Sequence, residues 1–269
     1  MIHRLFTAGI ALLFSLGSPS SYAASPRLDY TLVASYPHID SVFTQGLELF
    51  QGRLYESSGL YGRSRVLSSP FPPDTTAPKD LRGVALPDWF FAEGLTFYRG
   101  RLYLLSWREG MLFVLDPHSF TLLEKHRYAG HGWGLCAQKD RLVMSDGSAT
   151  LQWRDARTFA PLGSLKVHDQ NGPVDKLNEL ECHGPYILAN RWKSTEVFII
   201  SAHSGMVIAR LDLSALVPPG LHEEAVLNGI AYDANDGSWL VTGKLWPNIH
   251  RIRFTLPKLA PVEAPLEQH

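Results

Sequence analysis

Short alternations of apolar and polar residues, separated by turn residues, run through most of this chain. One sequence motif recurs: a strand that begins with a Gly-Leu pair or a near equivalent, a polar turn, and a second short apolar strand. Its five copies begin at Gly46, Gly94, Gly134, Glu179 and Gly229. Apolar runs of this length, rich in β-branched and aromatic residues, are typical of strands. No stretch beyond the first two dozen residues has the spacing of a long amphipathic helix, so the pattern predicts an all-β protein.

The distance between copies predicts how the strands are grouped. Consecutive copies start 48, 40, 45 and 50 residues apart, which is the repeat length of a four-stranded propeller blade. Third strands are expected at residues 113–115, 197–200 and 249–254, and fourth strands at residues 122–128, 162–167 and 206–211. Residues 68–78, rich in Pro and Thr, predict a loosened loop in the first blade.

The ends of the repeat array predict how the ring closes. The fifth copy stops after its third strand, near residue 256, and a lone strand-like segment at residues 30–36 precedes the first copy. If this N-terminal strand completes the last blade, both exposed sheet edges are paired. The sequence therefore predicts one five-bladed β-propeller of four-stranded antiparallel blades, a single domain within residues 24–269. A β-sandwich with chance similarity is the alternative, and five in-phase copies disfavour it.

The first 23 residues have the pattern of an export signal. Arg4 precedes an apolar stretch at residues 5–16, and small residues at Ser21 and Ala23 frame a cleavage site. This stretch is too short to span a bilayer, and no later segment is long and apolar enough to do so. We expect cleavage after Ala23 and a periplasmic or secreted product.

Composition and net charge exclude several classes of protein. Of the 269 residues 45% are hydrophobic and 19% are charged, which excludes a disordered, collagen-like or coiled-coil chain. The net charge is −1 and basic runs are absent, which argues against a nucleic-acid partner. The two cysteines, Cys136 and Cys182, are either bridged or two small buried hydrophobic residues. The second interpretation is preferred, because each lies in an apolar strand-like run that fixes no pairing geometry.

The residues just before the five repeat starts are the first candidates for a functional site. Equivalent positions in a ring of blades converge at one mouth of the central channel, and a purely structural ring would repeat one residue type. Three amides, one carboxylate and one indole instead indicate a ligand pocket. These residues are Gln45, Glu93, Trp133, Asn178 and Asn228.

A second set lies at or just past the ends of the second strands: Trp107, Asp146, Trp192, Lys244 and Trp246. Packing between blades is an alternative use of these tryptophans. Arg191 and Lys244 stand beside Trp192 and Trp246, which would place cations among aromatic faces. A pocket is favoured over packing for Trp107, Trp133 and Trp192, whereas the two are evenly balanced for Trp246.

Glu93 is the only ionisable acid of the first set. Aromatic walls would desolvate it and raise its pKa towards the range of a general acid–base catalyst; a hydrogen-bonding strut is the alternative. Glu48 and Glu181 are expected to be structural or to lie on a strand face. Glu179, which replaces a repeat glycine, is expected to bond neighbouring loop amides. Catalytic-triad order, a phosphate loop and metal-ligand spacing are all absent. We expect no required cofactor and no catalytic metal, although the channel leaves room for a structural Ca²⁺.

The ordered motifs resemble one known family. Phe43-Thr44-Gln45-Gly46-Leu47, Glu93-Gly94-Leu95-Thr96, Gly132-Trp133-Gly134-Leu135, Leu177-Asn178-Glu179-Leu180-Glu181 and Thr242-Gly243-Lys244-Leu245-Trp246-Pro247 are similar to those of the plant-type and bacterial glutaminyl-peptide cyclotransferases. The resemblance implies a five-bladed propeller that converts the N-terminal glutamine of peptides or proteins to pyroglutamate and releases ammonia.

The resemblance also assigns roles to individual positions. It implies that Glu93 relays a proton, and that Gln45, Asn178 and Lys244 hold the substrate or stabilise oxyanion charge. Trp107, Trp133 and Trp192 match aromatic walls, and Asn228 and Trp246 are expected near the substrate without a specific role. We expect a monomer whose partners are peptides with N-terminal glutamine. The alternative function is a periplasmic peptide- or sugar-binding propeller without turnover.

Overall fold

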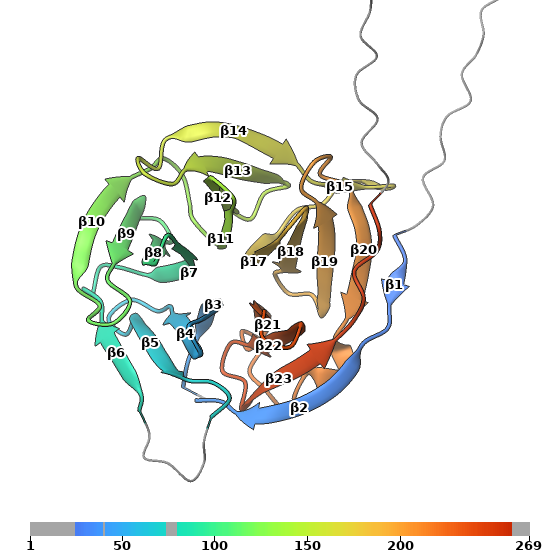
Figure 1. Cartoon of the computed structure of the whole chain (residues 1–269), viewed down its shortest axis with the longest axis horizontal. Coiled ribbons are helices and arrows are strands. Elements are labelled where there is room, and N and C mark those ends of the chain that lie inside the picture. The colour runs from blue at the N-terminus through green and yellow to red at the C-terminus, as the bar shows by residue number, and fades with distance from the viewer. Residues whose placement is uncertain (1–24, 40, 74–79, 260–269) are drawn as a thin grey trace, which may run out of the picture.

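Five blades, each with four antiparallel strands, are arranged in a ring around a central axis (Figure 1). The computed structural model describes residues 25–39, 41–73 and 80–259, so the export signal expected at residues 1–23 lies outside the described residues. Blade 1 contains β3 (Thr44–Phe50), β4 (Arg53–Ser58), β5 (Arg65–Pro70) and β6 (Arg82–Ala85). Blade 2 contains β7 (Ala92–Tyr98), β8 (Arg101–Ser106), β9 (Met111–Leu115) and β10 (Leu122–Arg127).

The remaining blades follow in chain order around the ring. Blade 3 contains β11 (Leu135–Gln138), β12 (Arg141–Met144), β13 (Thr150–Asp155) and β14 (Pro161–Lys166). Blade 4 contains β17 (Leu177–His183), β18 (Tyr186–Arg191), β19 (Glu196–Ser201) and β20 (Val207–Asp212). Blade 5 contains β21 (Leu227–Asp233), β22 (Ser238–Gly243), β23 (Asn248–Arg253) and β2 (Thr31–Pro37). The other elements are a hairpin of β15 (His168–Asp169) and β16 (Gly172–Pro173), and the 3-10 turn η1 (Ser214–Leu216).

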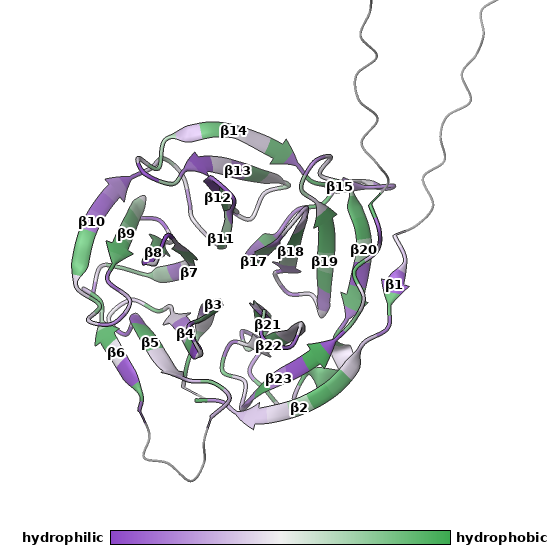
Figure 2. Cartoon of the chain, viewed as in Figure 1, coloured by the Kyte–Doolittle hydropathy of each residue, from purple (hydrophilic) through white to green (hydrophobic). Residues whose placement is uncertain are grey.

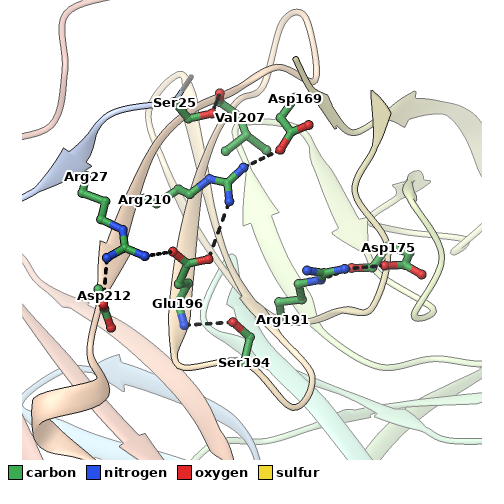
Figure 3. A network of polar contacts seen from close by, with 10 residues as sticks. All are labelled: Ser25, Arg27, Asp169, Asp175, Arg191, Ser194, Glu196, Val207, Arg210 and Asp212. Carbon is green, nitrogen blue, oxygen red and sulfur yellow. Dashed lines mark hydrogen bonds and ion pairs between the residues drawn. The ribbon is translucent and has the colours of Figure 1, made fainter. Parts of the chain in front are cut away.

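The N-terminal segment closes the ring as the repeat pattern predicted. Strand β2 pairs antiparallel with β23 and becomes the outer strand of blade 5. Just before it, β1 (Arg27–Leu28) pairs in parallel with β20 as a fifth strand of blade 4, an addition that the sequence did not predict. Arg27 pairs with Glu196 at 3.4 Å and with Asp212 at 3.2 Å, both on blade 4. Figure 3 shows these two contacts. Such exposed ion pairs contribute at most about 1 kcal/mol each.

The core consists of apolar clusters between adjacent blades. β19 is almost entirely hydrophobic and buried, whereas the outer strand β10 is mixed and largely exposed (Figure 2). The largest cluster joins blades 4 and 5 and includes Trp239 and Ile199. The cluster at the closing joint between blades 5 and 1 has only six buried members, among them Leu47 and Leu240. Apolar packing is therefore thinnest, among the described residues, where the ring closes.

The repeated glycine has a steric cause. The inner strands approach one another so closely around the channel that side chains do not fit at Gly46, Gly94 and Gly134. A Cβ atom at Gly94 would lie 2.5 Å from the backbone nitrogen of Leu135, and one at Gly134 would lie 2.0 Å from the carbonyl oxygen of Asn178. The glycine of the Gly-Leu motif is therefore required where the backbones of neighbouring blades are in contact.

Two predictions about local structure are corrected. Cys136 on β11 and Cys182 on β17 form a disulfide, so the preferred interpretation as two free buried thiols is wrong. The two residues are 46 positions apart in the chain, but neighbouring inner strands bring their Cα atoms to 5.4 Å. The loop expected at residues 68–78 begins later than predicted, because β5 continues to Pro70; residues 74–79 lie outside the described residues.

Within the described ranges, no helix combines the length and the hydropathy needed to cross a bilayer.

Candidate active site

Irregularities at the start of four inner strands aim polar side chains at one mouth of the channel. The strand register shifts between Thr44 and Gly46 in β3 and between Ala92 and Leu95 in β7. β17 and β21 show equivalent shifts. β-Bulges of this kind redirect the side chain of the extra residue. The residues within the four irregular stretches include Gln45, Glu93, Asn178 and Asn228, which are four of the five ring positions singled out in the sequence.

A cavity of about 830 Å³ opens at this mouth. Its volume is that of a small-molecule or peptide-terminus site. Of the nine predicted site residues, seven line it: Gln45, Glu93, Trp107, Trp133, Asn178, Trp192 and Lys244. All five blades contribute, so the site exists only when the ring is complete.

Glu93 is the buried acid of the cavity. Its side chain is only 4% exposed, and the Gln45 Nε2 donates a hydrogen bond to its Oε1 at 3.4 Å. Desolvation raises the pKa of Glu93 well above its usual range; the positive charge of Lys244 opposes this shift and the negative charge of Glu109 adds to it. A raised pKa makes the carboxyl easier to protonate, which favours a group that both accepts and donates a proton, as a general acid–base group must.

Lys244 supplies the positive charge of the cavity. It is 5% exposed, and its ammonium lies 4.7 Å from the centre of the Phe43 ring, in a cation–π contact. Desolvation lowers the pKa of Lys244, and the charges of Glu93 and Glu224 oppose that shift. Among the described residues no direct ion pair joins Lys244 to Glu93, which leaves the space between the two groups open to a ligand.

The tryptophans form half-buried walls. Trp133 and Trp192 meet edge to face with ring centres 6.0 Å apart, and Trp107 packs against Phe91 at 5.2 Å. Asn178 is 3% exposed, and its Oδ1 has no hydrogen-bond partner within the described part of the protein. A buried acceptor without a partner is costly, so a donor on a bound ligand would relieve it.

Two predicted site residues lie outside the cavity. Asn228 is fully buried and supports the site from beneath, because its Nδ2 donates to the Thr44 carbonyl at 3.0 Å and to the Gln45 Oε1 at 3.4 Å. Trp246 is also fully buried; its Nε1 donates to the Ala225 carbonyl at 2.9 Å. Neither side chain lines the cavity, and of the two evenly balanced interpretations of Trp246 the structure favours packing. Whether Asn228 acts near the substrate stays a prediction.

The cation–π partners also differ from those predicted. Lys244 lies over Phe43 rather than over Trp246. Lys193, not Arg191, lies over the Trp192 ring, at 5.0 Å. Arg191 instead pairs with Asp175 at 2.9 Å.

Sequence reasoning missed several lining residues. Phe43 and Phe91 each stand two positions before a ring residue, Gln45 and Glu93, so a shared repeat position was available as a signal. The rim residues come mostly from loops that the repeat does not describe: Ser41, Leu60, Arg63, Arg108, His222, Glu224 and Leu245. For these, the sequence contains no comparable signal.

The buried acids of the channel have structural partners. Glu179 replaces a repeat glycine, and its carboxyl accepts hydrogen bonds from the backbone amides of Leu47 at 3.4 Å and Ile230 at 2.9 Å. The prediction that it bonds backbone amides is confirmed, but these amides belong to the strands β3 and β21 rather than to loops. Glu48 accepts a hydrogen bond from the Thr96 hydroxyl at 3.0 Å. Nowhere in the described ranges are three or more His, Cys, Asp or Glu side chains arranged to hold a metal ion.

The protein is a closed β-propeller whose cavity at one mouth combines a buried carboxyl, a buried ammonium and aromatic side chains. Comparisons with known proteins give the particular family. The family model described as glutamine cyclotransferase matches residues 6–254. The chain therefore belongs to the glutamine cyclotransferase family, and it is an enzyme of that class.

Two relatives agree with this assignment. The chain is 32% identical to the glutaminyl-peptide cyclotransferase of Arabidopsis thaliana, over 94% of this chain and 82% of that protein. The crystal structure of Myxococcus xanthus glutaminyl cyclase superposes with a TM-score of 0.77 at 34% identity, covering 87% of this chain and 99% of that one.

Proposed function

We propose that the cavity converts the N-terminal glutamine of peptides and proteins to pyroglutamate, with release of ammonia and without a catalytic metal. The observation that carries the proposal is the pairing of buried Glu93 with buried Lys244 across a cavity that aromatic residues enclose. The names of the family and of both relatives support glutamine as the substrate residue.

The reaction requires the glutamine side chain to fold back on its own α-amine. The amine attacks the side-chain amide carbon, so one C–N bond forms and the carbonyl oxygen gains negative charge. The walls formed by Trp107, Trp133 and Trp192 restrict the extended conformations of the side chain, and such positioning lowers the barrier to an intramolecular reaction. They also exclude water, which strengthens the electrostatic interactions inside the cavity.

Glu93 transfers a proton from the attacking nitrogen to the departing nitrogen. Its carboxylate accepts a proton from the attacking nitrogen and donates it to the departing amide nitrogen, which leaves as ammonia when the second C–N bond breaks and the carbonyl re-forms. The same group acts first as base and then as acid, which suits a carboxyl of raised pKa. Gln45 holds the Glu93 carboxyl in place.

Lys244 and Asn178 act on the substrate itself. The Lys244 ammonium faces the negative charge that develops on the carbonyl oxygen, an interaction worth a few kcal/mol in a water-excluded site. The Asn178 Oδ1 accepts a hydrogen bond from the α-amine, which orients the nitrogen lone pair towards the amide carbon. Both roles place polar groups where charge or protons move during the reaction.

Incubation with a glutamine-initiated dipeptide tests the proposal. We expect ammonia release in step with the formation of pyroglutamyl peptide, measured by mass spectrometry, and the same rate after dialysis against a chelator. No product would overturn the proposed activity, whereas loss of rate on chelation alone would overturn only its metal independence.

We also propose that the enzyme is exported and acts as a monomer. The charged and apolar pattern of residues 1–23 and the Cys136–Cys182 disulfide are both typical of an oxidising, extracytoplasmic compartment. One chain supplies every cavity residue. N-terminal sequencing of the exported protein should begin at Ala24, and its light-scattering mass should be that of one chain.

A further inference from the structure

A buried histidine and a buried glutamate meet at the joint where the ring closes. His38 follows β2 and its side chain is 2% exposed; Glu56 lies on β4 and its side chain is 7% exposed. The His38 Nε2 is 3.0 Å from both carboxyl oxygens of Glu56. Neither residue lines the cavity, and the mechanism above uses neither.

The other side of the imidazole holds the turn that carries Lys244. The His38 Nδ1 is 2.7 Å from the carbonyl oxygen of Trp246, and the His38 backbone amide donates to the Pro247 carbonyl at 2.9 Å. Because a carbonyl oxygen only accepts hydrogen bonds, Nδ1 carries a proton. His38 therefore anchors the chain two and three residues after Lys244.

The turn itself is short, so an anchor at one end fixes the whole of it. The Trp246 amide donates to the Gly243 carbonyl at 3.1 Å, and Leu245 between them has a φ of +60°. On the other side, the amide of Lys244 donates to the Val226 carbonyl at 2.9 Å. With both ends held, the backbone of the turn is fixed at Lys244, whose side chain lines the cavity.

Glu56 continues the link into blade 1. The Thr44 hydroxyl donates to the Glu56 Oε1 at 2.5 Å, and Thr44 directly precedes Gln45, which holds Glu93. The chain of bonds from Trp246 through His38 and Glu56 to Thr44 thus crosses from blade 5 to blade 1. It lies where apolar packing between the described blades is thinnest.

We propose that His38 and Glu56 are positioning residues that hold Lys244 in register with Gln45 and Glu93 across the closing joint. The inference rests on the proposed function, because its main readout is the rate of cyclisation. A misplacement of a catalytic group by about 1 Å can lower a rate by about 100-fold, so a loosened turn should be visible in kcat.

Two substitutions of His38 separate its two contacts. In His38→Asn the amide nitrogen takes the place of Nδ1 and keeps the bond to the Trp246 carbonyl. In His38→Gln it takes the place of Nε2 and keeps only the contact with Glu56. We expect His38→Gln to lower kcat by about 10- to 30-fold with little change in KM, and His38→Asn to lower kcat by about threefold or less. Equal kcat values for the two variants would overturn the inference.

Glu56 provides an independent pair of variants, which also serves if His38→Gln does not fold. Glu56→Gln keeps the shape and lets an amide donate to the neutral imidazole while its oxygen still accepts from Thr44. Glu56→Ala breaks the link. We expect Glu56→Ala to lower kcat about 10-fold and Glu56→Gln to restore most of that loss. Failure of the glutamine variant to restore kcat would contradict a positioning role.

Coupling to Lys244 tests whether the effect passes through that side chain. In a Lys244→Met background, His38→Gln should produce no further loss of the residual rate, because the group that it positions is already absent. A further 10- to 30-fold loss in this background would mean that His38 acts by another route and would overturn the inference.

Asp233→Asn is the matched control for general destabilisation. Asp233 forms an equally buried ion pair with Arg251, at 2.9 Å, at the opposite end of β21 in blade 5. This variant should lower the melting temperature without changing kcat, and without speeding amide hydrogen exchange at residues 244–246, whereas His38→Gln should speed that exchange. A loss of kcat in Asp233→Asn as large as in His38→Gln would overturn the inference. A wild-type protein that releases no ammonia would instead overturn the proposed function, and the exchange measurement would still judge the positioning role.

Discussion

The mouth and the interior of the channel both bury a carboxyl group, Glu93 and Glu179, but of these two only Glu93 lines the cavity. Glu93 at the mouth and Glu179 in the interior are each almost fully buried, and desolvation raises the pKa of both. Both carboxyl oxygens of Glu179 accept hydrogen bonds from backbone amides, one in blade 1 and one in blade 5. Glu93 receives one long hydrogen bond from an amide side chain and faces a cavity with a lysine in it. A raised pKa alone therefore does not distinguish a catalytic acid from a structural one; access to a ligand and a nearby cation do.

Glu93→Gln should give the largest effect. The amide cannot relay a proton, so kcat should fall by about 100- to 10,000-fold, while the affinity for a glutamine-initiated peptide and the melting temperature stay close to those of the wild type. Steady-state kinetics together with calorimetric binding would check this. Retention of the rate would mean that the acid at the mouth is structural, like the interior ones.

Glu179→Ala should show the opposite profile. Its removal leaves the buried amides of Leu47 and Ile230 without an acceptor, which costs about 1–3 kcal/mol for each buried group. We expect a clear loss of stability in urea unfolding, with kcat of the remaining folded protein changed by less than about threefold. A rate loss comparable to that of Glu93→Gln would erase the distinction between mouth and interior.

Glu109→Gln should move the pH profile without removing any catalytic group. The negative charge of Glu109 raises the pKa of Glu93, and Glu93 must be ionised to accept a proton. Removing the charge lowers that pKa, so the acidic limb of kcat/KM should shift to lower pH. Glu124→Gln is the matched control, because Glu124 lies on the outer strand of the same blade and pairs with Arg101; its profile should not move.

Glu48→Gln should have the smallest effect, on stability alone. Burial raises the pKa of Glu48 from 4.5 to about 7 in the folded protein. The folded state therefore keeps a proton that the unfolded state loses, and stability falls as the pH rises from about 4.5 to about 7. The variant cannot ionise at this position, so its melting temperature should decline less over that window. If the melting temperature of the variant fell with pH as steeply as that of the wild type, other carboxyls of the channel would determine the pH dependence of stability.

The blade architecture was predictable because the close contact between neighbouring blades recurs once in each repeat. Gly46, Gly94 and Gly134 are required by backbone contact between blades, so the sequence repeats wherever the contact does. Seven of the nine predicted site residues line the cavity because equivalent positions of the repeat lie at the same end of the channel. Phe43 and Phe91 share a repeat position and were accessible to the same argument.

Orientation within a turn was not predictable. Trp246 follows Lys244 by two residues, yet the positive φ of Leu245 turns the chain so that the Trp246 ring lies against Gly243 and away from the cavity. The rim residues His222 and Glu224 belong to an irregular segment with no counterpart in other blades. The Cys136–Cys182 bridge depends on the exact approach of two inner strands, which strand assignment alone does not supply.

The closure of the ring by β2 has a consequence for the order in which the molecule can mature. The strand paired with β2 is β23, and the two are more than 200 residues apart in the chain. Contacts of such high sequence separation form slowly and cannot form before the last blade has been synthesised. A chain emerging from the ribosome or from a translocation pore already carries β2, but until β21–β23 have emerged it lacks both the strand that pairs with β2 and the turn that holds Lys244. The complete ring, and with it the cavity, can therefore form only after β23 has emerged, and we expect chains truncated before β23 to be inactive.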